Sequence, residues 1–220
     1  MALHRASPPP AAAPGAGRPH SRAALRASAS APPAPSALSF AVRDVESEAD
    51  VHQLADLYAH FVSTSLSTLA YEGEAPSREE FCAKWRARGA MPWLVAMDGD
   101  TLLGYCYVGP FRARAGWRFA AEHSIYIRPG CQRRGVGEAL LTRTVQRCRE
   151  AGVGTLMAVI SSDAETGVGQ GSIALHAKCG WEHAATLPRV AVKDATVLDV
   201  TFMRLALNPL TPEMDHRALG

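Results

Sequence analysis

Several common features are missing from this sequence. No acidic residue occurs before Asp44, and no apolar run approaches the roughly 18–20 residues that a transmembrane helix needs. The five cysteines are odd in number, scattered and without a CxxC pair, which argues against a disulfide framework or a zinc site. The net charge is only +2, so composition gives no argument for nucleic acid or an anionic membrane. We therefore expect no metal, no nucleic-acid partner and no membrane partner.

Residues 1–38 differ in composition from the rest of the chain. Residues 1–36 hold eight of the fifteen prolines, four arginines and much alanine and serine. Such a segment buries too little apolar surface to offset its ordering entropy, so we expect a disordered N-terminal extension. Its composition also matches an organellar transit peptide, without separating chloroplast from mitochondrion. The alternative is an untargeted extension of a cytoplasmic protein.

The remaining chain has enough apolar material for one domain of ordinary size, with 47% hydrophobic residues over the whole sequence. We assign this domain to residues 39–207 and a polar C-terminal tail to residues 208–220. Apolar periodicity predicts the order β-α-α-β-β-β-α-β-α-β-β, which is a mixed α/β (α+β) sheet rather than a doubly wound one. Ser77 and Glu80 form a predicted capping box, and residues 98–100 predict a hairpin turn.

The most informative stretch runs from 122 to 141. Residues 125–127 are β-branched and aromatic, which predicts a strand, and apolar residues recur at helical spacing from Gly137 onward. Between them lies Gln132-Arg133-Arg134-Gly135-Val136-Gly137, a basic loop that leads into the helix. Backbone N–H groups at a helix N-terminus bind pyrophosphate well, and the arginines add positive charge.

Two other interpretations of this loop are open. One is an ordinary basic loop before a helix in an α/β domain without a ligand. The other is a dinucleotide site of the Rossmann kind. That second interpretation lacks a third glycine at the fingerprint spacing and an acidic residue about twenty positions further on.

The strand, the loop motif R/Q-x-x-G-x-G/A and the helix together resemble the GNAT superfamily of N-acetyltransferases. Over roughly residues 40–206 the sequence is similar to the phosphinothricin acetyltransferase branch. The matching segments are Pro92-Trp93-Leu94-Val95-Ala96, Gly109 to Arg114, Ala121-Glu122, Tyr126, Gln132-Arg133 and Leu175-His176. The resemblance implies the GNAT fold, a single domain with a central, mostly antiparallel sheet flanked by helices. It further implies acetyl-CoA as cosubstrate, a small-molecule amine as acceptor and a homodimer.

The resemblance also implies roles for individual residues. Glu122 is the expected general base, because burial in a cleft raises the pKa of a carboxyl group, although a carboxylate at the start of a strand can also be only a surface charge. His176 is expected to donate a proton to the sulfur of CoA or to hold its pantetheine arm, although histidine on a short helix is often only a polar packing residue. The expected cofactor contacts are Tyr126, Ile127, Gln132, Arg133, Arg134, Gly135, Val136, Gly137 and Glu138, with the Ile127 N–H as oxyanion donor. His123 should face away from Glu122, because successive strand residues alternate between faces.

The acceptor is less well specified. Arg112, Arg114 and Lys193, with Arg118 beside them, are candidates for binding an anionic amino acid, but solvated loop charges are equally ordinary. Trp117 and Gly169 stand where the branch usually has tyrosine and asparagine, which puts phosphinothricin itself in doubt. We expect direct acetyl transfer to an amino acid or an analogue such as phosphinothricin, methionine sulfone or methionine sulfoximine. The alternatives are an acceptor such as a protein N-terminus, polyamine or antibiotic, or a non-catalytic acyl-CoA-binding module.

Overall fold

The computed structural model of the protein describes residues 39–212. The predicted leader at 1–38 and the end of the predicted tail lie outside the described residues. No helix in the part of the chain that the structure describes is long and apolar enough to cross a membrane.

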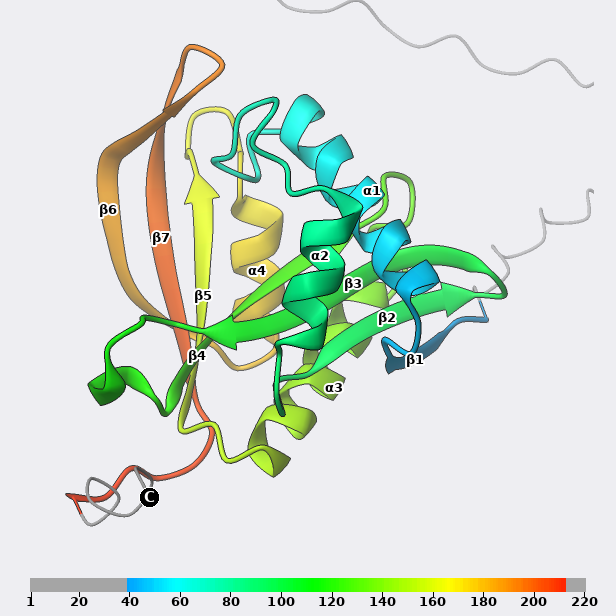
Figure 1. The fold of residues 1–220 in the computed structure, drawn as a ribbon. Coiled ribbons are helices and arrows are strands. Elements are labelled where there is room, and N and C mark those ends of the chain that lie inside the picture. The colour runs from blue at the N-terminus through cyan, green and yellow to red at the C-terminus, as the bar shows by residue number, and fades with distance from the viewer. Residues whose placement is uncertain (1–38, 213–220) are drawn as a thin grey trace, which may run out of the picture. The chain divides into compact units, whose positions relative to one another are not determined.

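One seven-stranded sheet organises the domain, in the order β1-β2-β3-β4-β5-β7-β6 (Figure 1). The strands are β1 Ala41–Asp44, β2 Trp93–Asp98, β3 Thr101–Pro110, β4 Ala120–Ile127, β5 Thr155–Ser162, β6 Glu182–Lys193 and β7 Thr196–Ala206. All neighbouring pairs are antiparallel except β4 and β5, which are parallel. The predicted single domain with a mixed, mostly antiparallel sheet is confirmed, and so is the predicted order of the elements.

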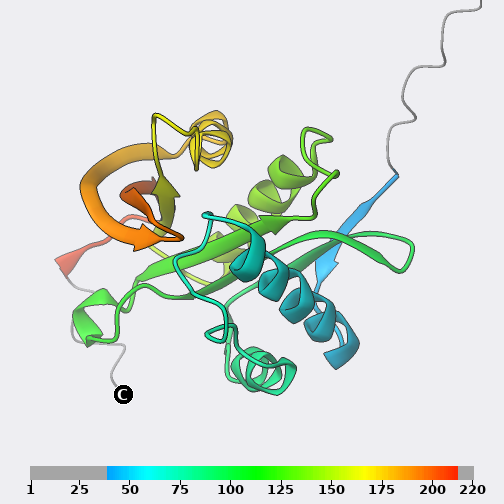
Figure 2. The same cartoon turned by 90° about the horizontal axis from the view of Figure 1, so that it is seen from above.

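Helices cover both faces of the sheet (Figures 1 and 2). They are α1 Glu48–Thr64, α2 Arg78–Arg86, α3 Val136–Glu150 and α4 Gln170–Lys178. Trp93 and Tyr105 pack with α1 and α2, whereas Leu94 and Cys106 pack on the face that α3 covers. β2 is therefore buried on both sides, which explains its continuous apolar run.

Both helices on the α1–α2 face begin with a capping box. The predicted one is present, because Glu80 N–H donates to Ser77 Oγ at 3.2 Å and Ser77 N–H donates to Glu80 Oε2 at 2.7 Å. A second box, which sequence analysis did not predict, pairs Ser47 with Asp50. The Asp50 carboxylate also accepts two hydrogen bonds of 2.8 Å from Arg43. This contact ties the start of α1 to the edge strand β1.

The parallel strands β4 and β5 part halfway along their length. Their register begins with Ala120 opposite Thr155 and ends with His123 opposite Ala158. Beyond that point β4 continues beside β3 alone, and β5 continues beside β7 alone. The sheet therefore has an opening between its two halves at the carboxyl ends of both strands.

Lys193, the last residue of β6, is completely buried. Its Nζ donates to the backbone oxygens of Val62, Ser65 and Thr68 at 2.9, 2.8 and 3.0 Å. An ammonium group has three N–H donors, so all of them are used. Val62 lies in the last turn of α1, and Lys193 thus supplies donors at the end of that helix. Lys193 therefore does not fit the predicted substrate-binding role, because its ammonium group is buried and donates all of its hydrogen bonds to backbone oxygens of the protein.

Replacing Lys193 with methionine should lower the free energy of unfolding by about 3 kcal/mol, because three backbone oxygens lose a charged donor. Urea denaturation would measure the change. Lys178→Met is the control, since its ion pair with Glu138 is exposed and such pairs add little stability. Equal losses in the two variants would contradict this account of Lys193.

Candidate functional site

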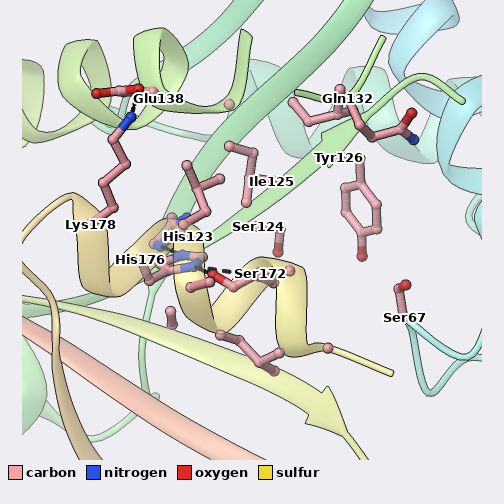
Figure 3. Close-up of a pocket in the computed structure, with 18 of the residues that line it drawn as sticks. Ser67, His123, Ser124, Ile125, Tyr126, Gln132, Glu138, Ser172, His176 and Lys178 are labelled. Carbon is pink, nitrogen blue, oxygen red and sulfur yellow. Dashed lines mark hydrogen bonds and ion pairs between the residues drawn. The ribbon is translucent and has the colours of Figure 1, made fainter. Parts of the chain in front are cut away.

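A cavity of about 760 Å³ occupies the opening between β4 and β5. Its walls come from the end of α1, the loop after it, β4, β5, the loop before α3, and α4 (Figure 3). Ser124 and Tyr126 line it from one face of β4, and His123, Ile125 and Ile127 line it from the other. Because neighbouring strand residues point to opposite faces, the cavity passes along the edge of β4 and reaches both sides of the sheet.

Two peptide groups of β4 are free to bond along this edge. Arg128 N–H donates to Leu103 O, and Phe111 N–H donates to Ala120 O, so the even-numbered residues of β4 bond to β3. The peptide groups of Ile125 and Ile127 point the other way, toward the side that β5 has left. The N–H of Ile127, which was expected to be free, therefore points into the opening between β4 and β5. The N–H of Ile125 points the same way.

The loop before α3 presents a further set of donors. Gly135 is the N-cap of α3 with φ +83°, and no side chain of the described residues caps this helix. The first helical bond runs from Ala139 N–H to Gly135 O. The N–H groups of Val136, Gly137 and Glu138 therefore have no partner among residues 39–212. Together with the positive end of the helix, they suit a pyrophosphate group.

Glycine at 137 keeps this helix start close to α4. A Cβ at Gly137 would lie 2.8 Å from Leu175 Cδ2 and would push into the cavity wall. Lys178 of α4 also reaches across, with its Nζ 2.6 Å from Glu138 Oε2. The space between α3 and α4 is thus narrow, and its polar groups come from both helices (Figure 3).

Most of the predicted cofactor contacts line the cavity. These are Tyr126, Ile127, Gln132, Arg133, Gly135, Gly137 and Glu138. Arg134 does not line it, and neither does Val136, whose side chain is buried in the core beside Leu140. Val136 therefore offers its backbone N–H rather than its side chain.

Glu122 lies outside the cavity lining, on the α1–α2 face of β4. Its neighbour on that face, Ser124, lines the cavity and is about 7 Å further along the strand. The Glu122 carboxylate is 3.8 Å from Arg112 Nη1. Burial raises the pKa of Glu122, and the positive charges of Arg112 and Lys84 offset part of the rise. A carboxyl group with a raised pKa at this position fits the role of a general base.

His176 faces the cavity from α4 and contacts His123 on the opposite side of β4 from Glu122. The two Nε2 atoms are 3.1 Å apart, and His176 Nδ1 is 2.7 Å from Ser172 O (Figure 3). The expectation that His123 faces away from Glu122 is confirmed. It is nevertheless His123, and not Glu122, that lines the cavity with His176.

The predicted acceptor-binding arginines lie in the exposed loop after β3. Arg112 packs over the Phe111 ring at 4.0 Å and lies near Glu122. Arg114 precedes a short 3-10 helix, Ala115–Trp117. Neither arginine lines the cavity. Of the predicted cations, Arg112 is the one that the structure brings beside the expected base.

Sequence reasoning missed several residues of this region. Lys84 of α2 donates to the Tyr107 hydroxyl at 3.1 Å and raises the positive potential at Glu122. Phe61 and Ser67 line the cavity from α1 and the loop after it. These residues come from elements far away in sequence, and no local motif marks them.

One group of residue types that bind metals occurs in the described part of the chain, outside the cavity lining. It consists of Glu48, His52 and Cys82, and Glu48 is paired with Arg86.

Gly169 sets the position of α4 against β5. It is the N-cap of α4 with φ +75°, and a Cβ there would lie 2.2 Å from Ser161 O. A left-handed backbone and a contact this close both require glycine. The asparagine that the resembled branch usually carries would not fit this arrangement.

We expect Gly169→Ala to lower the free energy of unfolding by at least about 2 kcal/mol, because left-handed strain adds to a backbone clash. Gly171→Ala is the matched control, since a Cβ there meets no atom within 4 Å and alanine favours helix. Urea denaturation of both variants would check this. A stable Gly169→Ala variant would mean that α4 can shift away from β5 at little cost.

Known proteins are similar to this chain in both sequence and fold. The chain is 35% identical over 162 residues to phosphinothricin N-acetyltransferase from Alcaligenes faecalis, covering 72% of this chain and 79% of that protein. It is 34% identical over 176 residues to L-methionine sulfoximine/L-methionine sulfone acetyltransferase from Pseudomonas paraeruginosa, covering 78% and 97%.

Solved structures extend the similarity to the fold. A phosphinothricin acetyltransferase from Sinorhizobium meliloti, in complex with acetyl-CoA, matches with a TM-score of 0.69 and 31% identity, covering 77% of this chain and 89% of that one. A sequence model described as "Acetyltransferase (GNAT) family" matches residues 54–181, which is more than half of the chain. With this match, the parted strands and the open helix N-terminus beside them, the protein belongs to the acetyltransferase (GNAT) family.

Proposed function

We propose that this protein transfers the acetyl group of acetyl-CoA to the amine of a small amino acid or amino-acid analogue. The observation that carries the proposal is the cavity itself. It joins a free helix N-terminus and two free peptide groups of β4, and Glu122, a carboxyl group with a raised pKa, lies next to it on the same strand. The acceptor class follows from relatives that are named for phosphinothricin and for methionine sulfoximine and sulfone.

The residues present fit acetyl-CoA. The free N–H groups of Val136, Gly137 and Glu138 would hold its pyrophosphate, and Arg133 would add positive charge. The free peptide groups of Ile125 and Ile127 would bond to the pantetheine arm in the manner of a strand. When bound, acetyl-CoA supplies a thioester that is open to attack by an amine.

A carboxylate, a backbone N–H and two cations of the protein then act on the transfer. Glu122, directly or through a water molecule, takes the proton that the attacking amine loses. The N–H of Ile127 or Ile125 stabilises negative charge as it develops on a carbonyl oxygen beside β4. Arg112 and Lys84 flank Glu122 and would attract the carboxylate of an amino-acid acceptor. In this scheme the acetyl group would pass directly to the amine and CoA would leave as its thiolate, without a covalent intermediate on the enzyme.

An acceptor panel with wild type and Glu122→Gln tests this function. We expect thiol release from acetyl-CoA with at least one of methionine sulfone, methionine sulfoximine and phosphinothricin, and a loss of about 100-fold or more in Glu122→Gln. The rate of the wild type should fall as pH drops through the raised pKa of Glu122, because the protonated carboxyl cannot accept a proton. Glu182→Gln, an exposed carboxylate on β6, is the control.

The same panel separates the alternatives. Turnover restricted to spermidine, an aminoglycoside or a peptide N-terminus would overturn the amino-acid assignment. Tight CoA binding without turnover on any acceptor would indicate a binding module instead of an enzyme. If CoA did not bind at all, the role assigned to the helix N-terminus would be wrong.

We also propose that two copies of the chain associate through β6. This strand ends the sheet, and nearly all of its residues are exposed. Leu187, Val190 and Val192 are 45%, 54% and 56% exposed, and Tyr71 beside them is 44% exposed. A long apolar edge strand is a surface that soluble proteins normally cover.

Introducing charge at this edge should separate the copies. We expect a wild-type dimer and a monomer for Val190→Glu/Val192→Glu, because buried carboxylates would oppose association. Light scattering after size-exclusion chromatography gives the mass. Leu210→Glu, also at a residue 56% exposed but outside β6, should leave the mass unchanged. A monomeric wild type would refute the proposal.

A further inference from the structure

Two histidines meet in the cavity wall, and only one of them, His176, was expected to contribute to the reaction. His123 and His176 are 4% and 1% exposed, and their rings stack with centroids 5.0 Å apart. Trp181 packs edge-on against both rings. Each ring nitrogen of the pair also has a defined neighbour, so the positions of the protons can be deduced.

Ser172 determines which nitrogen of His176 is protonated. Its backbone oxygen is 2.7 Å from His176 Nδ1 and can only accept, so Nδ1 carries the proton. In neutral His176 the Nε2 atom is then an acceptor. The distance of 3.1 Å between the two Nε2 atoms requires one proton between them, and His123 must supply it. His123 Nδ1 is left as an acceptor, with the Cys106 thiol 3.7 Å away.

The surroundings keep the pair uncharged. Burial, together with His176, lowers the pKa of His123 to about 3, and burial lowers the pKa of His176. Cys106 of β3 and Cys148 of α3 share this core, and burial raises the pKa of both thiols to about 12. From α4, Lys178 is engaged with Glu138 at the surface. β5 contributes only Ala158, Val159, Ile160 and Ser161 to the cavity wall, none of which titrates.

We propose that His123 is a positioning residue for acetyl transfer, which donates its Nε2–H to His176 and thereby fixes the orientation and tautomer of that ring in the cavity. The inference rests on the proposed function, since it gives the ring a task in that reaction. The hydrogen bond from His123 also decides between the two roles expected for His176. Both nitrogens of His176 are engaged by the protein, so this arrangement has no N–H to give to a sulfur. His176 instead forms a neutral, fixed wall against which the pantetheine arm can lie.

Nitrogen NMR on protein with ¹⁵N-labelled histidine tests the proton positions without any substrate. We expect the wild type at pH 7 to show His176 protonated on Nδ1 and His123 protonated on Nε2. His176→Gln and His123→Gln assign the two signals among the eight histidines of the chain. If His176 carries its proton on Nε2, or if both rings are charged at pH 7, the proposal is wrong.

Two substitutions at His123 test the effect on the reaction. His123→Leu removes the donor at similar volume, whereas the amide of His123→Gln can still donate to His176. In the leucine variant the pKa of His176 should rise, because the hydrogen bond to its neutral form is lost. The value of kcat should fall about tenfold, with a further loss at acidic pH that sets in at a higher pH than in the wild type, because His176 becomes charged more readily. KM for acetyl-CoA should stay within about twofold, and the glutamine variant should retain most of the wild-type kcat.

The results for the His123 variants can be told apart from a failure of the proposed function. Equal loss in both variants, with raised KM and an unchanged pH profile, would show that His123 acts only in packing. Wild-type kcat in His123→Leu would overturn the positioning role. A wild type without turnover would refute the proposed function, while the NMR result would still decide whether His123 fixes the ring of His176.

Discussion

The separation of β4 from β5 is the constraint on which the rest of the site depends. Two parallel strands normally satisfy each other's peptide groups along their whole length, and here they do so only as far as His123 and Ala158. The unused groups of Ile125 and Ile127 need partners, and the cavity beside them can hold a ligand that supplies these. The helix N-terminus of α3 opens into the same space and adds donors for a phosphate group.

The two faces of β4 then take different tasks. Glu122 lies on the face of α1 and α2 among Arg112 and Lys84, where positive charge holds its pKa below what burial alone would give. His123 and His176 lie on the other face, in an apolar core that disfavours charge. An ionisable carboxylate and a neutral imidazole pair are thus kept apart by one strand, with the imidazole pair in the cavity wall and the carboxylate just outside the cavity on the opposite face.

Close contacts fix the positions of two parts of the cavity wall, the loop after α1 and helix α4. Lys193 uses its whole ammonium group to hold the loop that carries Ser67, so a buried charge here is fully compensated. Gly169 lets α4 approach β5 to a distance that no side chain would allow. From the sequence, Lys193 was predicted to bind the substrate, and Gly169 was interpreted as a departure from the resembled branch. Their structural contacts give a simpler physical reason for each.

Local sequence determined the elements, their order, and the loop that opens α3, because periodicity, capping residues and glycine positions act over a few residues. It also determined that Glu122 and His123 face apart, since alternation is a property of a single strand. Only the tertiary structure decided that His123 contacts His176 and that the charge of Lys84 lowers the pKa of Glu122. It also decided that Lys193 donates all its hydrogen bonds to the end of α1 and the loop after it. These contacts join residues 38 to 131 positions apart, and the packing of helices on the sheet, which no local pattern encodes, brings them together.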